Sequence, residues 1–209
     1  MKLGRLILRA VVGGFFVGHG TQKLFGWFGG HGLDGTSQMF ESLGLRPGKA
    51  HAAAAGAAET SGGAMLVAGA ATPLAASILI ATMLTAINRV HVKNGPWATN
   101  GGYEYNVVLI AAALALAETG PGAPSVDVAS GSEMYGPLWA LLALAGGVAG
   151  AAGAHLIAER GTSPAEPAPP AGTPASSAPA PAPEPIAAAP NAPDAPPQTP
   201  EPPAPAPNA

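Results

Sequence analysis

The sequence has no cysteine among its 209 residues. Disulfide bonds, thiol catalysis and cysteine-ligated zinc or iron–sulfur centres are therefore excluded. Charge is also scarce, because only 10% of the residues are charged, against about 25% in ordinary soluble domains. Apolar residues make up 48% of the chain, and the mean hydropathy is positive. This composition predicts a membrane protein in contact with the lipid bilayer. We expect it to be a multi-pass protein of the cell (plasma) membrane.

Several functional signatures are missing as well. Residues 1–160 hold nine basic and eight acidic side chains, a balance of +1, and no basic patch or stripe is visible. We therefore expect no nucleic-acid partner. The chain also lacks a glycine-rich dinucleotide loop after a strand, a P-loop and a nucleophile elbow. The sequence therefore gives no support for an enzyme that uses a soluble cofactor.

Proline is concentrated at the C-terminus. Residues 161–209 contain 18 of the 24 prolines and no lysine or arginine. Such a segment has too few large apolar side chains to offset the entropy of folding, which predicts a disordered Pro/Ala-rich tail. We divide the chain into a four-helix membrane core (1–128), a linker with an additional transmembrane helix (129–160) and this tail (161–209).

Five apolar segments are long enough to be candidates for membrane spans, which need about 20 residues. Pro73 is expected to mark a tight turn between the second and third, since residues 60–88 carry no charge and one straight helix would overshoot the bilayer. The predicted fold is an all-α membrane protein, a four-helix transmembrane bundle with a fifth C-terminal transmembrane helix. The segments are Leu3 to Phe28, Lys49 to Ala71, Thr72 to Val92, Tyr103 to Thr119 and Pro137 to Ala158.

Two pairs of glycines are spaced for close contact between helices. Gly14 and Gly18 form a G-x-x-x-G pattern in the first segment, and Gly146 and Gly150 form another in the fifth. This spacing lets two helix backbones approach each other. We expect both pairs to lie at helix contacts.

Polar residues gather in one half of the membrane when the segments are threaded through it in turn. With a rise of about 1.5 Å per residue, His19 and Glu59 lie roughly 13 Å inside the boundary opposite Met1. Thr85, Asn88 and Arg89 are expected to share one helix face. The remaining polar residues lie closer to that boundary, namely Lys23, Asn88, Arg89, His91, Glu104 and Asn106. These groups are expected to form one intramembrane site.

Glu59 is the most informative member of this cluster, because it lies in an alanine-rich segment with no charge nearby in its own helix. A charge inside the bilayer is costly and needs a partner or a proton. Glu59 then either takes part in function or pins helix packing through a pair with Lys23 or Arg89. Lys93 is expected to anchor at the membrane interface, and His155 is expected to lie at the interface, away from the cluster.

The histidines could in principle bind a haem or a metal ion, but few sequence features support either site. A haem would use His19 and His91 as axial ligands, but they lie at different depths, and haem is not expected. A metal held by His19, Glu59 and His91 has suitable ligand types but no spacing signature. We therefore assign no metal ligands.

A series of short motifs resembles the DoxX family of integral membrane proteins over residues 3–128. The first is residues 18–26 (GHGTQKLFG), which resembles the family's first-helix signature. The rest follow in order: residues 44–47 (GLRP), 59–63 (ETSGG), 88–91 (NRVH), 104–106 (EYN) and 120–127 (GPGAPSVD).

The resemblance implies a four-helix membrane core similar to subunits linked to thiosulfate:quinone oxidoreduction and to proteins of quinone or oxidative-stress responses. A distant similarity to surfeit-locus cargo receptors shows that such a fold need not be enzymatic. We therefore expect a quinone-linked oxidoreductase subunit with soluble or membrane redox partners, and keep binding, transport or scaffolding as alternatives. The expected catalytic residues are Glu59, His91 and Glu104, and the expected cofactor-binding residues are His19, Lys23, Asn88 and Arg89.

Overall fold

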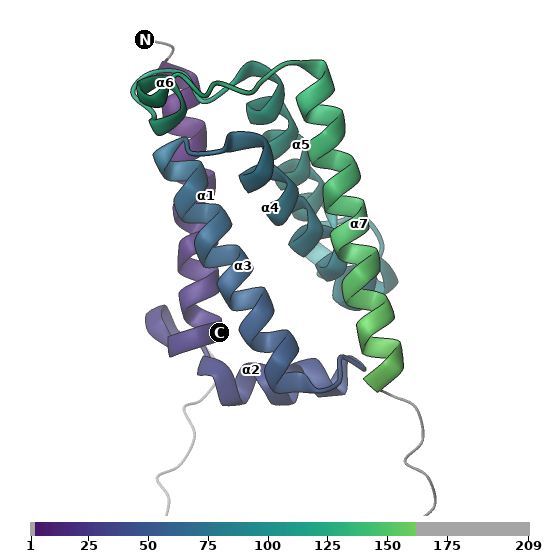
Figure 1. Ribbon diagram of the computed structural model, residues 1–209. Helices are drawn as coiled ribbons and strands as arrows, with labels where there is room; N and C mark the ends of the chain where they lie inside the picture. Colours follow the sequence, from purple (N-terminus) through teal and green to yellow (C-terminus); the bar gives the residue numbers. More distant parts are fainter. Residues whose placement is uncertain (1–2, 162–209) are drawn as a thin grey trace, which may run out of the picture. The chain divides into compact units, whose positions relative to one another are not determined.

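The computed structural model describes residues 3–161, and over this range the chain is helical, with no strand. The predicted all-α membrane bundle is confirmed (Figure 1). The predicted tail of 161–209 lies, beyond Gly161, outside the described residues. The α-helices are α1 (Leu3–Phe25), α2 (Gly32–Ser42), α3 (Gly48–Ala68), α4 (Thr72–Ala86), α5 (Glu104–Thr119), α6 (Val126–Ser130) and α7 (Pro137–Gly161).

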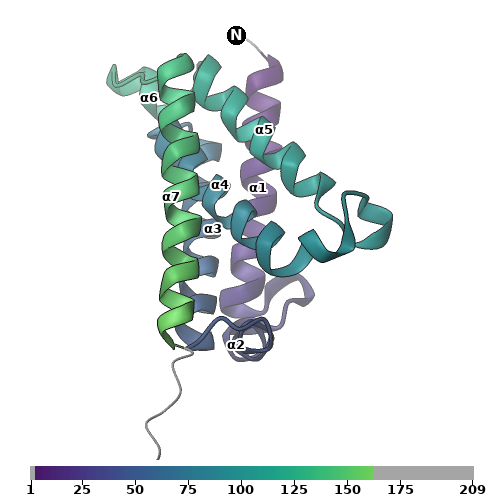
Figure 2. The same ribbon diagram turned by 90° about the vertical axis from the view of Figure 1, so that its right-hand side faces the viewer.

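Five of these helices, α1, α3, α4, α5 and α7, run along the bundle and match the five predicted segments (Figures 1 and 2). Three helical stretches are long and apolar enough to cross a membrane: Leu3–Phe25, Thr72–Asn94 and Pro137–Gly161. The other two are α5, which has 16 residues, and α3, which carries Glu59. The first turn of α1 lies at the same end of the bundle as α6, and α2 lies at the opposite end (Figure 1).

Close backbone contact joins α1 to α3. A Cβ atom on Gly13 would lie 2.6 Å from the carbonyl oxygen of Gly63, so a larger residue would force the two helices to shift at this crossing. By contrast, Gly14 and Gly18 have no atom within 4 Å of a Cβ built on them. The prediction that these two glycines mediate helix contact within the chain is wrong, because the face one residue earlier in the helix packs instead.

The second glycine pair does pack within the chain, against α4. A Cβ on Gly146 would lie 2.4 Å from the Ser77 hydroxyl, and one on Gly150 would lie 3.0 Å from the Ala81 side chain. The small residues of α7 thus allow it to lie close beside α4. This contact makes α7 part of the bundle and not a separate anchor.

The turn between α3 and α4 falls where Pro73 predicted it. The chain reverses through Gly69 and Ala71, both in the left-handed region with φ of 63° and 43°, and Pro73 occupies the first turn of α4. The carboxylate of Asp127, in α6, accepts hydrogen bonds from the Ala71 and Thr72 amides at 2.6 and 3.1 Å. A residue 55 positions away in sequence therefore caps α4.

Two arginines of α1 fix the loop between α5 and α6 at the same end. Arg5 donates to the carbonyl oxygens of Thr119 and Gly120. Arg9, which is buried, donates to the carbonyl oxygens of Pro121, Gly122 and Pro124. The motif at 120–127 is thus held structurally, far from α2.

Apolar side chains fill the half of the bundle nearest this loop. One cluster centres on Phe16, Leu66, Leu79 and Leu116, and a second joins α4, α5 and α7 around Ile80. The long helices are therefore packed together in this half of the bundle. The half nearest α2 instead contains the cavity described below.

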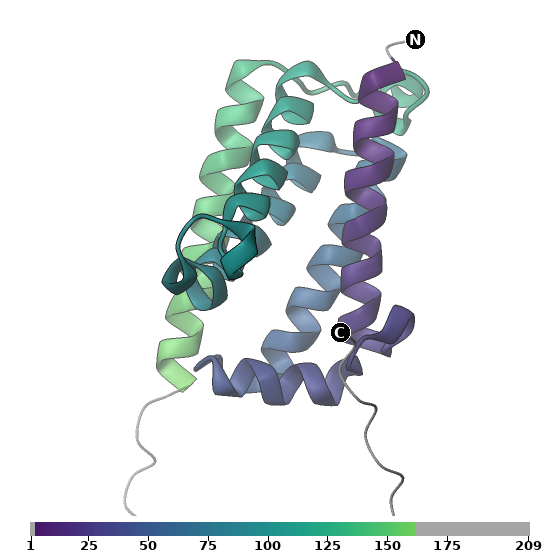
Figure 3. The ribbon, with the colours of Figure 1, turned by 180° about the vertical axis from the view of Figure 1, so that it is seen from behind.

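A short helix that the sequence did not predict crosses the end of the bundle. The residues between the first two predicted segments make α2, which lies across the ends of α1 and α3 (Figures 1 and 3). Thr36 is buried, and Phe40 and Leu43 line the cavity described below. Spacings of three and four residues between these positions are typical of an amphipathic helix.

Candidate functional site: an intramembrane cavity

A cavity of about 700 Å³ occupies the half of the bundle nearest α2. Ligand sites for small molecules commonly measure about 300–1,000 Å³. Helices α1, α3, α4, α5 and α7 form its walls, and residues of α2 and the turn after it complete the lining. Its apolar lining includes Phe15, Phe16, Met39, Phe40 and Met83.

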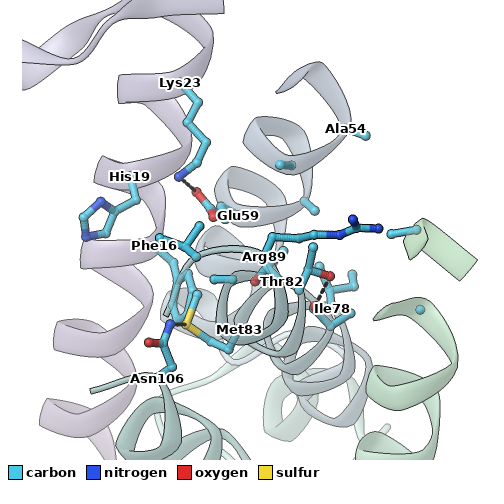
Figure 4. Close-up of a pocket in the computed structure, with 18 of the residues that line it drawn as sticks. Phe16, His19, Lys23, Ala54, Glu59, Ile78, Thr82, Met83, Arg89 and Asn106 are labelled. Carbon is cyan, nitrogen blue, oxygen red and sulfur yellow. Dashed lines mark hydrogen bonds and ion pairs between the residues drawn. The ribbon is translucent and has the colours of Figure 1, made fainter. Parts of the chain in front are cut away.

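An ion pair between α1 and α3 lies in the cavity wall (Figure 4). The Nζ of Lys23 lies 2.6 Å from Oε2 of Glu59 and donates to it. The Glu59 side chain is 8% exposed and that of Lys23 is 22% exposed. The close α1–α3 crossing positions this pair, because it brings the last turn of α1 against α3. The partner that the sequence required for Glu59 is therefore Lys23.

Arg89 reaches the cavity from a π-helical turn. After Ala86 the chain continues as a π-helix over Ile87–His91 and then as a 3-10 turn over Val92–Asn94. Such π turns are often found at functional sites. Arg89 lines the cavity, and Figure 4 shows its guanidinium pointing toward α7.

His155 of α7 receives the Arg89 side chain. The Nη2 of Arg89 is hydrogen-bonded to Nδ1 of His155, and Nε2 of His155 lies 3.1 Å from Oε1 of Glu159. The prediction that His155 lies away from the cluster is wrong. Sequence threading placed it at the correct end of the bundle but gave no information on which helix α7 contacts.

Two further predicted residues also line the cavity. His19 does so with its Nδ1 3.0 Å from Oε1 of Gln22. His91 does so with its Nδ1 2.8 Å from the Gly101 carbonyl oxygen. Buried Asn106, which the threading also selected, lines the cavity and donates to the Met83 sulfur. Within the described residues, His19, Glu59 and His91 do not gather into a metal site.

Asn88 and Glu104 are not brought to the cavity. Both are exposed, and neither is among the lining residues. Thr85 and Arg89 line the cavity, whereas Asn88, in the same π turn as Arg89, faces away from it. Glu104 begins α5, and its amide donates to the Pro96 carbonyl oxygen at 2.8 Å. Their predicted roles have no geometric support from this cavity.

Sequence reasoning missed several polar lining residues, among them Ser77, Thr82 and, most notably, His51. It lines the cavity from the first turn of α3, and its Nε2 is buried with no hydrogen-bond partner among the described residues. The signal was present, because His51, Ala55 and Glu59 are each four residues apart and therefore share one helix face.

Comparison with known proteins bears on the family of this chain. A family model described as DoxX matches residues 4–92. The chain is 33% identical to the Bacillus subtilis (strain 168) protein named "Putative oxidoreductase CatD" over 115 residues, which cover 55% of this chain and 79% of that protein. No solved structure matches the chain. The family model ends just after His91, so α5 and α7 lie beyond its match.

Proposed function

This chain belongs to the DoxX family, and from that premise we propose that it is a subunit of a membrane oxidoreductase system and binds a quinone in its intramembrane cavity. The proposal places the protein in the plasma membrane. It assigns contact with the quinone to His19, Lys23 and Arg89, and proton exchange to Glu59 and His91.

The observation that carries this proposal is an apolar cavity with a nearly buried ion pair in its wall. A quinone needs an apolar slot for its ring, donors for its carbonyl oxygens and groups that exchange protons with its reduced form. The ammonium of Lys23 is a donor, and the Glu59 carboxylate beside it is a proton acceptor. Both groups lie at the edge of the space that a ring would fill.

Electrons must come from a partner protein. The chain has no cysteine to hold an iron–sulfur cluster or form a redox disulfide. The relative from Bacillus subtilis is named an oxidoreductase, and we extend that activity to this chain as part of the proposal. The partner is a soluble or membrane redox protein that docks on the subunit.

The test is the quinone content of the full chain purified in mild detergent. Organic extracts are analysed by mass spectrometry for wild type, Glu59→Gln and a matched control, Glu118→Gln. Glu118 is exposed and lies at the other end of the bundle. We expect quinone in wild type and in the control, and its loss in Glu59→Gln.

Two results would contradict the proposal. One is a wild-type protein that carries no quinone and takes up none when quinone is added. The other is a haem absorption band, which would make His19 and His91 the first ligands to test. Ligand-dependent thermal stabilisation without any change in the redox state of the ligand would favour a binding or transport protein instead.

A further inference from the structure

The charges that line the cavity do not cancel. The carboxylate of Glu59 neutralises Lys23 at 2.6 Å, but within the described part of the chain no carboxylate lies within 4 Å of the Arg89 guanidinium. Its lysine, arginine and glutamate side chains together give the lining one net positive charge. A cation inside the bilayer is stabilised by a matching anion. A bound ligand with one negative charge would supply it.

The contact with His155 keeps Arg89 available for such a ligand. A guanidinium has only donors, so Nδ1 of His155 must accept the hydrogen bond from Arg89, and the ring proton lies on Nε2, facing Glu159. His155 carries no negative charge and does not compensate the charge on Arg89. It occupies one of five N–H donors and leaves the others for a ligand.

Polar groups lie on two different sides of the cavity. The Lys23–Glu59 pair belongs to the α1–α3 wall, whereas the Arg89 guanidinium points toward α7 (Figure 4). A ligand that uses both needs oxygen atoms at two edges of an apolar body. A fatty acid has one polar end and leaves the second site unused. A ring with oxygens at opposite edges serves both.

We propose that the quinone of this site is a hydroxyquinone bound as its monoanion, with the ionised ring oxygen on Arg89. This inference rests on the proposed function and adds the charge state of its ligand. A hydroxyl on a quinone ring is conjugated with the opposite carbonyl and acidic like a carboxylic acid, so it is ionised at neutral pH. The ionised oxygen and the neighbouring carbonyl oxygen match the two-donor fork of a guanidinium. The other carbonyl faces Lys23, and His155 is a positioning residue that acts through Arg89.

The test compares two probes that differ in charge but hardly in shape. Dissociation constants of 2-hydroxy-1,4-naphthoquinone and 2-methoxy-1,4-naphthoquinone are measured at neutral pH on the full chain in detergent, by quenching of tryptophan fluorescence. We expect wild type to bind the hydroxy compound at least tenfold more tightly. Arg89→Gln is expected to lose this preference and to keep its affinity for the methoxy compound, which also shows that the variant is folded. Lys93→Gln, an exposed cation outside the cavity lining, is the matched control and keeps the preference.

His155 is tested by rescue. His155→Leu removes the acceptor and is expected to reduce the preference for the hydroxy compound several-fold. His155→Gln restores an acceptor through its amide oxygen and is expected to recover most of it. Equal preferences in the two variants would show that His155 does not position Arg89. If Arg89→Gln does not fold, Arg89→Lys keeps the charge without the fork and is expected to retain only part of the preference.

The remaining outcomes separate this inference from the proposed function. Equal binding of both probes by wild type overturns the anion and leaves the quinone site standing. Binding of neither probe overturns both proposals. Displacement of the hydroxy probe by palmitate, with an affinity that depends on Arg89 and not on Lys23, would identify an acyl anion as the ligand and overturn the hydroxyquinone.

Discussion

The hydroxyl of Thr72 donates to the Asp127 carboxylate at 2.8 Å, across 55 residues of sequence. The same carboxylate accepts the Ala71 and Thr72 amides, and both Thr72 and Asp127 are buried. One side chain thus closes the α3–α4 turn.

Replacement of this cap is expected to destabilise the bundle. Asp127→Ala leaves two amides and a hydroxyl at the start of α4 without their acceptor, at a cost of about 1–2 kcal/mol for a helix cap. Thermal unfolding in detergent should show a fall in Tm of several degrees. Asp34→Ala is the control, because the Asp34 side chain is 88% exposed. Equal Tm values for the two variants would refute the capping role.

Removal of one member of the intramembrane ion pair is expected to cost more than removal of both. Glu59→Gln leaves Lys23 without its carboxylate, at a cost of about 3–5 kcal/mol for a buried pair. The double variant Lys23→Gln/Glu59→Gln should regain most of that stability. Quinone binding should be lost in both, and a double-mutant cycle measures the coupling. Restored quinone binding in the double variant would show that the Lys23–Glu59 pair serves helix packing and not quinone binding.

Two neighbouring glycines of α1 are expected to differ sharply in their tolerance of a methyl group. Gly13→Ala forces a Cβ to within 2.6 Å of the Gly63 carbonyl oxygen, and we expect a loss of about 1–3 kcal/mol from overpacking. Gly14→Ala meets nothing within 4 Å and should be neutral or gain up to about 1 kcal/mol in helix propensity. Paired melting curves measure both. A stable Gly13→Ala protein would show that the crossing relaxes freely.

A large side chain in the cavity is expected to block the ligand without unfolding the protein. Ala54 lines the cavity and has an exposed side chain, so Ala54→Phe fills empty space and should weaken quinone binding at least tenfold. Ala57→Phe, on the same helix but outside the lining, should bind as wild type. Dissociation constants and Tm values of the two variants decide the matter, and wild-type binding by Ala54→Phe would move the ligand elsewhere.

The sequence predicted the helices well because apolar segments and the Pro73 turn are local signals. Threading also placed His19, Lys23, Glu59, Arg89 and His91 together, because alternation of direction across a bilayer is a strong constraint. Their roles stay predictions.

What the sequence did not predict depends on contacts between distant segments or on local departures from the α-helix. The π turn over Ile87–His91, which holds both the exposed Asn88 and the lining residue Arg89, has no signature in apolar spacing. The link from His155 to Arg89 depends on which helix α7 packs against. Gly32 and Gly35 weaken the helical signal of α2, and packing against α3 and α1 supplies what propensity does not.

The long helices are joined at one end and separated by the cavity at the other. The α3–α4 turn is closed by Asp127, and the neighbouring loop is held by Arg5 and Arg9, whereas the cavity lies toward α2. The hydrogen bonds to the loop carbonyl oxygens and to the Asp127 carboxylate make this end of the bundle the fixed end. Small rotations about that fixed end would change the width of the cavity most where Lys23 and Arg89 lie. The angle between the helices would therefore vary with the size of the ligand. The residues that set this angle, Arg5, Arg9 and Asp127, do not line the cavity.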